Sequence, residues 1–450
     1  VFFLKKVIDV TDEVNALEKK MLAEGKHFGI RKLSFILEKE YKKEYPEYEP
    51  YLSSMWSGEK YYMALYLVYS DIRLVAAPPV SIAAFGGDID NWEWPQHKCD
   101  FAMYRIYADA DGKPAAYSEN NLPLKPVRKL NISTKGRTDR WSSSFKLVQK
   151  KDVTLPISNE IRGKQMEITE KWMNAEPQIR LMYSNWYFGL SNVQELNEGE
   201  VLCYNRFNVA ADKRSQEAEL ARWIAASPQR SAQWSSMLSD LETKYKAVED
   251  VERNRTWFRE TLVRGSRMSL ITARLKNSKS SLKAVAPVYK EIDLRVEKEL
   301  FTYSAEMFLR NVDREYWSDF QKDIVSKFTD AETGKTDYKA LCDSIWAGSY
   351  IAGGFESLKN SGVFDAPHGR GQGGPKYEGP GKGGVGKGQG RGGENCRFGD
   401  DPLFRFLQDV KITVFNEKLR AIEGNPDILA LSREYTHALY EMRIDKGEPV

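Results

Sequence analysis

The segment Phe85-Gly-Gly-Asp-Ile-Asp-Asn-Trp-Glu-Trp-Pro-Gln-His-Lys-Cys-Asp-Phe101 is the most informative part of this 450-residue chain. It combines two adjacent glycines, which allow a tight turn, with aspartate and asparagine acceptors and two large tryptophan side chains. Two strand-like runs flank it, Arg73-Leu-Val-Ala-Ala-Pro78 before it and Phe101-Ala-Met-Tyr-Arg-Ile-Tyr107 after it. Loops between strands often carry binding and catalytic residues. On composition alone, a tryptophan-rich loop that only plugs the end of a barrel is an alternative interpretation.

The segment resembles the signature of the S46 peptidases, the bacterial dipeptidyl-peptidases related to types 7 and 11. That signature reads Gly-Gly-Asp-x-Asp-Asn-Trp-x-Trp-Pro-x-His-x-x-Asp-Phe. Two neighbouring stretches extend the resemblance, Asp71-Ile-Arg-Leu-Val-Ala-Ala-Pro-Pro79 and Val80-Ser-Ile-Ala-Ala-Phe-Gly-Gly87. It covers nearly the whole chain, and it implies an exopeptidase that releases dipeptides from the free N-terminus of peptides.

The resemblance implies roles for four residues. Asp100 falls on the family's triad aspartate, which accepts a hydrogen bond from the catalytic His and fixes its tautomer. Asn91 and Trp92 fall on residues that cradle the α-amino group of the substrate, and Asn192, in Gly189-Leu-Ser-Asn-Val193, also reaches that group. The sequence departs from the signature where the family commonly has Arg, Thr and Gly, at Gln96, Lys98 and Cys99.

The implied fold is α+β, an incomplete chymotrypsin-like double β-barrel with a large α-helical cap. We expect residues 1–145 to form a partial β-rich peptidase domain that carries the triad aspartate. We expect residues 146–450 to form the α-helical cap domain, which closes one end of the cleft.

A serine peptidase also needs a nucleophile and a base within hydrogen-bond reach of each other. The family takes its His from a Thr-Asn-His-His-Cys-Gly-Tyr-like segment and its Ser from a Gly-Asn-Ser-Gly-Ser-Pro-like segment, and neither occurs here. His97 belongs to the signature without being the triad base, and we expect His27 and His437 at the surface. We therefore expect an internal, inactive portion of a peptidase. The alternative is a non-catalytic remnant that binds peptide N-termini.

Bulk properties exclude several classes of protein. The net charge of +3 gives no broad basic surface for nucleic acid. The longest apolar stretch contains two prolines and is too short to span a bilayer. The four cysteines lack CxxC spacing, which argues against a metal site or a disulfide framework, and no cofactor is expected. The resemblance implies peptide substrates, a homodimer, and a periplasmic or cell-envelope location. It leaves open whether cleavage follows acidic or hydrophobic residues.

Residue patterns predict strands first and helices afterwards. Aromatic and β-branched residues predict strands at Tyr51–Trp56, Lys60–Tyr69 and Phe101–Tyr107, with turns at Ser57-Gly-Glu and Asp109-Ala-Asp-Gly-Lys. Leu, Lys and Glu spacing between Val14 and Tyr45 predicts two helices. Later helical periodicity covers Ile161–Tyr187, Ala210–Tyr245, Arg253–Leu275, Val288–Val312, Pro402–Glu423 and Ile428–Met442.

Two places do not fit the family. At Ser133-Thr-Lys-Gly-Arg-Thr-Asp-Arg-Trp141 a strand and turn of the relatives are missing. Residues 366–398 hold a Gly-rich tract, in which Gly381-Lys-Gly-Gly-Val-Gly-Lys387 imitates a phosphate-binding loop but has Gly388 where a Ser or Thr should hold magnesium. Repeated Gly-Lys-Gly units produce such matches by chance, and no interleaved aromatics support RNA stacking. We expect this insertion to be disordered, as a flexible linker or a product of damage to the gene.

Overall fold

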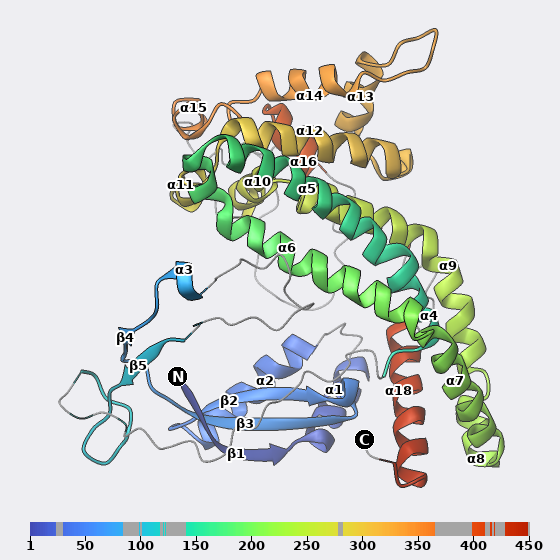
Figure 1. The fold of residues 1–450 in the computed structure, drawn as a ribbon. Helices are drawn as coiled ribbons and strands as arrows, with labels where there is room; N and C mark the ends of the chain where they lie inside the picture. Colours follow the sequence, from blue (N-terminus) through green and yellow to red (C-terminus); the bar gives the residue numbers. More distant parts are fainter. Residues whose placement is uncertain are drawn as a thin grey trace, which may run out of the picture.

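The computed structural model describes residues 1–23, 30–83, 99, 101–117, 120, 122, 141–277, 282–364, 398–409, 415, 418 and 428–448. The Gly-rich tract up to residue 397 and the seam at 133–140 lie outside these ranges. The described strands lie near the beginning of the chain, and the long helices follow them (Figure 1).

A three-stranded antiparallel sheet opens the chain. Its order is β1 (Phe2–Asp9), β3 (Lys60–Val68) and β2 (Glu49–Met55), and two helices lie beside it, α1 (Thr11–Ala23) and α2 (Ile30–Glu44). Side chains alternate across a strand, so Tyr61, Met63 and Leu65 of β3 all point into the core under these helices. The two expected helices and both strands are confirmed, as is the turn at Gly58, whose φ is +106°.

A second sheet contains only β4 (Ile72–Ala76) and β5 (Met103–Ile106), with the short helix α3 (Val80–Ala83) between them in sequence. The expected strands at these places are confirmed. Within the described ranges the strands form these two small sheets, and closure into two barrels stays a prediction. The turn after β5 is confirmed: Asp109 Oδ1 accepts hydrogen bonds from the backbone N–H groups of Asp111 and Lys113, at 3.0 and 2.7 Å.

The rest of the described chain is helical. The long hairpin of α5 (Leu155–Ala175) and α6 (Pro177–Arg206) crosses the middle of the molecule (Figure 1). The other helices are α4 (Ser144–Gln149), α7 (Val209–Ala225), α8 (Pro228–Trp234), α9 (Met237–Phe258), α10 (Arg267–Asn277), α11 (Leu282–Tyr289), α12 (Leu294–Asn311), α13 (Asp319–Lys327), α14 (Tyr338–Ala347), α15 (Phe355–Lys359), α16 (Pro402–Gln408) and α18 (Ile428–Asp445). Two π-helical turns interrupt them, η2 (Lys150–Thr154) and η3 (Arg259–Val263).

The predicted helical run Ile161–Tyr187 is divided in the structure. Glu176 is extended, with φ −137° and ψ 118°, and Pro177 begins the next helix. Proline has no backbone N–H to continue α5 but fits the first turn of α6, and the residue before it is pushed out of the helical region. The chain therefore reverses there and forms two helices.

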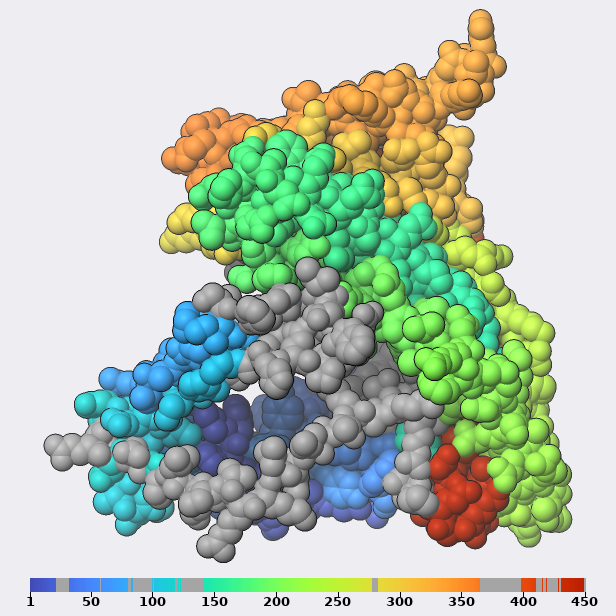
Figure 2. Space-filling view, in the orientation of Figure 1, coloured from blue at the N-terminus to red at the C-terminus, as the bar shows by residue number. Residues whose placement is uncertain are grey.

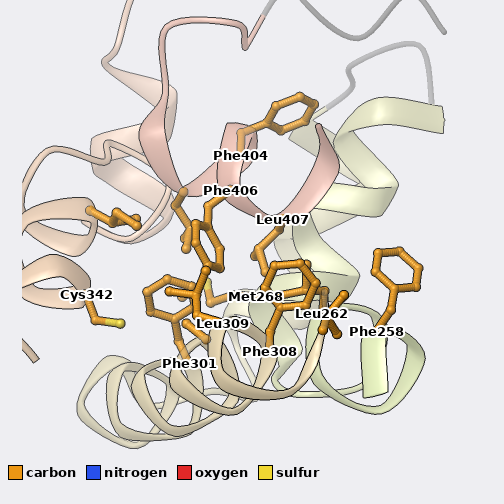
Figure 3. Close-up of a cluster of buried hydrophobic side chains, with 14 of the residues drawn as sticks. Phe258, Leu262, Met268, Phe301, Phe308, Leu309, Cys342, Phe404, Phe406 and Leu407 are labelled. Atoms are coloured by element: carbon orange, nitrogen blue, oxygen red, sulfur yellow. The ribbon is translucent and has the colours of Figure 1, made fainter. Parts of the chain in front are cut away.

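The main core of the helical part is rich in phenylalanine. Phe301 and Phe308 of α12 point toward Phe406 of α16, with ring centroids 5.7 and 6.2 Å from it (Figure 3). Phe398, which the sequence analysis included in the Gly-rich insertion, is fully buried in this core. Its ring lies 5.3 Å from Phe404, so the packed structure already includes the last residue of that range.

Helix α18 joins the helical part to the first sheet. On one side it packs against α7, α8 and α9 (Figure 2). On the other side Tyr440 lies 6.1 Å from the ring of Trp56. Tyr440 also lies 6.3 Å from Trp141, and the Arg443 guanidinium is 5.6 Å from that indole. The first and the last segments of the helical part therefore meet at one place.

Candidate active site

The β4–β5 ladder holds both ends of the signature segment. The two strands pair Ile72 with Ile106 and Leu74 with Tyr104, so the chain between them leaves and returns at one end of the hairpin. Beyond the ladder, the Cys99 N–H donates to Ile82 O at 3.4 Å. The β-branched and aromatic residues of the two strands, such as Ile72, Tyr104 and Ile106, favour the extended conformation. The hairpin therefore holds the chain on both sides of the signature segment.

An ion pair steadies the start of β4. Arg73 Nε donates to Asp71 Oδ1 at 3.1 Å, and this hydrogen bond holds the pKa of Asp71 below its usual value. The Arg73 guanidinium also lies over the rings of Tyr117 and Tyr107, 4.2 and 5.3 Å from their centroids. These contacts fix the hairpin on the side away from the signature loop.

Three of the four predicted site residues lie outside the described residues: Asn91, Trp92 and Asp100. The neighbours of Asp100 are described, and both Cys99 and Phe101 are exposed. The structure therefore gives the anchoring of the loop.

Asn192 lies in the middle of α6 and is half-buried. The buried face of this helix carries Ile179, Tyr183 and Asn197. Asn192 follows Leu190 by two residues, a rotation of about 200° around the helix, so it lies on the opposite face. Leu181 on that outer face is 78% exposed. In the view of Figure 1, α6 runs between the other long helices and α3.

Sequence reasoning missed a cavity of about 570 Å³ behind α6. Four arginines from three separate segments line it, together with residues of α6 and α11. In the sequence these arginines look like ordinary solvated helix residues, since only the packing of α5 against η3 and α10 brings them together. No local sequence signal could have identified the cavity.

Metal and membrane features were sought in the described part of the chain. It contains no group of three or more His, Cys, Asp and Glu side chains placed to hold a metal ion. No helix within it is both long and apolar enough to cross a membrane. Cys99, Cys203 and Cys342 are unpaired thiols.

Comparison with known proteins identifies relatives. The sequence model of the family described as peptidase S46 matches residues 1–356. The dipeptidyl-peptidase 7 of Phocaeicola vulgatus is 30% identical over 366 residues, which cover 72% of this chain and 50% of that protein. An Asp/Glu-specific dipeptidyl-peptidase of Capnocytophaga gingivalis is 27% identical over 341 residues, 69% of this chain and 46% of that protein. The chain thus spans about half the length of these curated relatives.

Solved structures show the same fold. The crystal structure of Porphyromonas endodontalis DPP11 in complex with the dipeptide Arg-Glu superimposes with a TM-score of 0.72 at 22% identity. The superposition covers 100% of this chain and 63% of that one. The mostly helical architecture with small sheets is therefore shared with that protein.

Proposed function

Because this chain belongs to the S46 peptidase family, we propose that its protein releases dipeptides from the free N-terminus of peptides by serine-type hydrolysis. The observation that carries the proposal is the family match over residues 1–356, which includes the signature loop and Asn192. Relatives named dipeptidyl-peptidase 7 and relatives named Asp/Glu-specific both match, so the proposal does not include a preference for the residue at the cleaved bond.

In this proposal Asp100 orients the catalytic base. Its carboxylate accepts the Nδ1–H of a histidine, so that Nε2 can take the proton of the attacking serine. The proposal takes the serine and the histidine from segments like the family's Ser and His motifs, which do not occur in this sequence. The β4–β5 hairpin supports the role of Asp100, because it anchors the chain directly beside that residue.

The amine pocket explains why two residues are removed at a time. An ammonium group is recognised by neutral acceptors and by an aromatic face. We assign the acceptors to Asn91 and Asn192 and the aromatic face to Trp92. A charged terminus held at a fixed distance from the serine places the second peptide bond at the nucleophile. The outward position of Asn192 on α6 supports this assignment.

The test uses a chimera in which the flanking segments of the Phocaeicola vulgatus relative complete the chain. The chimera should release the fluorophore from a dipeptidyl reporter, and Asp100→Asn should lower kcat by about 10⁴, as in other triads. Asp71→Asn is the matched control, since Asp71 is a partly exposed aspartate at the start of the same hairpin, and it should lower kcat less than about threefold.

The same chimera decides between catalysis and binding alone. An N-acetylated reporter should be a poor substrate, because it lacks the ammonium. Equal cleavage of free and acetylated reporters would refute the exopeptidase proposal. A chimera that binds free-amine peptides without cleaving them would instead support a binding protein.

Resemblance to the family also leads us to propose a homodimer in the periplasm or cell envelope. Both can be measured on the native protein. Release by osmotic shock and a sedimentation mass of two chains would support the proposal. Retention in the cytoplasm would contradict the proposed location. A single chain in solution would contradict the proposed homodimer.

A further inference from the structure

The cavity behind α6 has the size of a ligand site. Its volume of about 570 Å³ lies within the range of small-molecule pockets. Five segments form its walls: α5, α6, η3, α10 and α11. The lining residues used in the argument are Arg162, Arg264, Arg267, Arg274, Trp186 and Leu190.

A buried carboxylate shared by three arginines lies at one side of the cavity. Glu260 is 1% exposed, and its oxygens lie 3.0 Å from Arg264, 3.2 Å from Arg259 and 3.4 Å from Arg162. A guanidinium does not lose its proton in proteins. One carboxylate therefore faces three positive charges, and the net charge of these four side chains is positive.

Arg162 contributes to this positive charge from a buried position. Its side chain is 12% exposed, and its Nη1 atom has no hydrogen-bond partner among the described residues. Burial lowers the pKa of this guanidinium, and the charges of Arg264 and Arg259 lower it further. A buried cation with an unused donor is costly unless an anion compensates it.

The opposite wall, on α10, adds two more guanidinium groups. Arg267 Nη1 donates to Glu291 O, and Arg274 Nη1 donates to Ala284 O at 3.0 Å. These two partners are backbone carbonyls, and the buried Glu297, whose Oε2 accepts the Arg267 backbone N–H at 2.8 Å, also lies close enough to interact with the charge of Arg267. Four arginines and two glutamates line the cavity in total. Its lining is therefore net positive.

An apolar surface completes the site. Trp186 lines the cavity, and the Arg267 guanidinium lies 5.8 Å from its ring and 4.9 Å from the ring of Tyr183. The remaining apolar lining residues are Leu190, Leu270, Pro287 and Val288. Positive groups next to an aromatic and aliphatic surface favour a ligand with both an anionic and an apolar end.

The backbone around the cavity is tightly constrained. The π-helical turn η3 places Glu260, and π-helical turns often occur at functional sites. Gln165 Nε2 donates to the carbonyl oxygens of Arg264 and Gly265, both at 2.9 Å. A Cβ on Gly265 would lie 1.9 Å from Thr261 O, so only glycine fits there. The arginines are thus held on a fixed frame.

We propose that this cavity binds a small organic anion, in which a carboxylate or phosphate group is attached to an aromatic or aliphatic group. The site is separate from the proposed amine pocket, because Trp186 and Leu190 face it from the inner side of α6 and Asn192 lies on the outer side. It therefore goes beyond peptide hydrolysis.

Isothermal titration calorimetry of the intact chain with 4-phenylbutyrate tests the proposal. We expect saturable binding of one molecule per chain. The neutral 4-phenylbutyramide should bind at least about tenfold more weakly, because it makes no charged hydrogen bond. Butyrate, which lacks the ring, should also bind more weakly. Phenyl phosphate shows which anionic group the arginines prefer, since the tighter of the two anions identifies it.

Two variants assign the binding to the cavity. Arg264→Gln removes a half-exposed lining arginine and should weaken 4-phenylbutyrate binding about tenfold. Arg259→Gln removes another partner of the same Glu260 but does not line the cavity, so it should change the dissociation constant by less than about twofold. If Arg264→Gln does not fold, Arg274→Gln takes its place.

Three results would overturn the proposal. One is the absence of saturable binding of both anions to the intact chain. Another is equal binding of the acid and the amide, which would remove the role of charge. The third is an equal loss in Arg259→Gln and Arg264→Gln, which would show an indirect effect through Glu260.

Discussion

The rings of Phe364 and Phe398 lie 5.9 Å apart in an edge-to-face arrangement, although residues 365–397 separate them in sequence. Phe398 is fully buried and also contacts Phe404. The Gly-rich tract therefore leaves and re-enters the helical core at one point. Its length has little influence on how the surrounding helices pack.

Replacing residues 369–393 with a short Gly-Ser linker should leave the melting temperature almost unchanged. The closure entropy of a loop changes by only about 0.6 kcal/mol per doubling of length. Phe398→Ala should instead cost about 3–5 kcal/mol, because it removes a buried aromatic ring. Thermal unfolding of both variants measures the contrast. A large loss of stability in the linker variant would show that the tract packs against the core.

Gly265→Ala should destabilise the chain by about 1–3 kcal/mol or more. A Cβ at this position would clash with Thr261 O at 1.9 Å and with Ser304 Oγ at 2.5 Å. Gly199→Ala is the matched control, because nothing lies within 4 Å of its Cβ position on α6. That change should stabilise α6 by about 0.5–1 kcal/mol. The midpoint of urea unfolding should therefore fall in Gly265→Ala and rise in Gly199→Ala.

The stabilising effect of Glu59 on α18 should depend on pH. His437 Nδ1 lies 2.6 Å from Glu59 Oε2, and this hydrogen bond raises the pKa of His437 above its usual 6.5, with a smaller contribution from the charge of Glu441. Because the folded-state pKa is the higher one, the pair stabilises fully below about pH 6.5. That contribution is lost as the pH rises through the folded-state value.

Unfolding free energies of wild type and Glu59→Gln at pH 5.5 and pH 9 measure this effect. At pH 5.5 the difference in unfolding free energy between wild type and Glu59→Gln should be below about 1 kcal/mol, since the imidazole is nearly half exposed. This difference should be smaller at pH 9. Arg433→Gln breaks the neighbouring pair of α18 with Glu18, which is 2.6 Å long and contains no histidine. The difference in unfolding free energy between wild type and Arg433→Gln should therefore be the same at both pH values. A Glu59→Gln difference equally constant with pH would show that His437 stays neutral.

Asn192→Ala in the completed chimera should lower kcat/KM for free-amine substrates about tenfold or more, since a hydrogen bond to a charged group contributes about 1.5–3 kcal/mol. Asn185→Ala is the control, because it removes an exposed asparagine of the same helix, about 10 Å from Asn192 along the axis. It should have little effect. Equal losses in both variants would mean that α6 matters only for stability.

The local elements could be predicted from the sequence where side-chain patterns are strong. The alternation in β3 and the helical spacing of α1 and α2 gave the correct elements. Strand β1 was missed, because Phe2–Asp9 is mostly exposed and depends on pairing with β3 for its conformation. The helix break before Pro177 was missed as well, since the apolar periodicity continues through it.

The candidate site was only partly predictable for a different reason. The signature loop is contiguous, so its residues could be recognised from sequence alone. The cavity depends on contacts such as Arg162 with Glu260, which lie 98 positions apart. His437 was predicted to be a surface residue and is partly exposed, but its contact with Glu59 across 378 positions could not be foreseen. Long-range packing, not residue type, decides these features.

The meeting of Trp141 with Tyr440 has an evolutionary consequence. The helical part of the chain runs between these two residues and returns to the place where it began. A unit of this kind can be gained, lost or exchanged between genes in a single event, because the remaining protein needs only a short join across the gap.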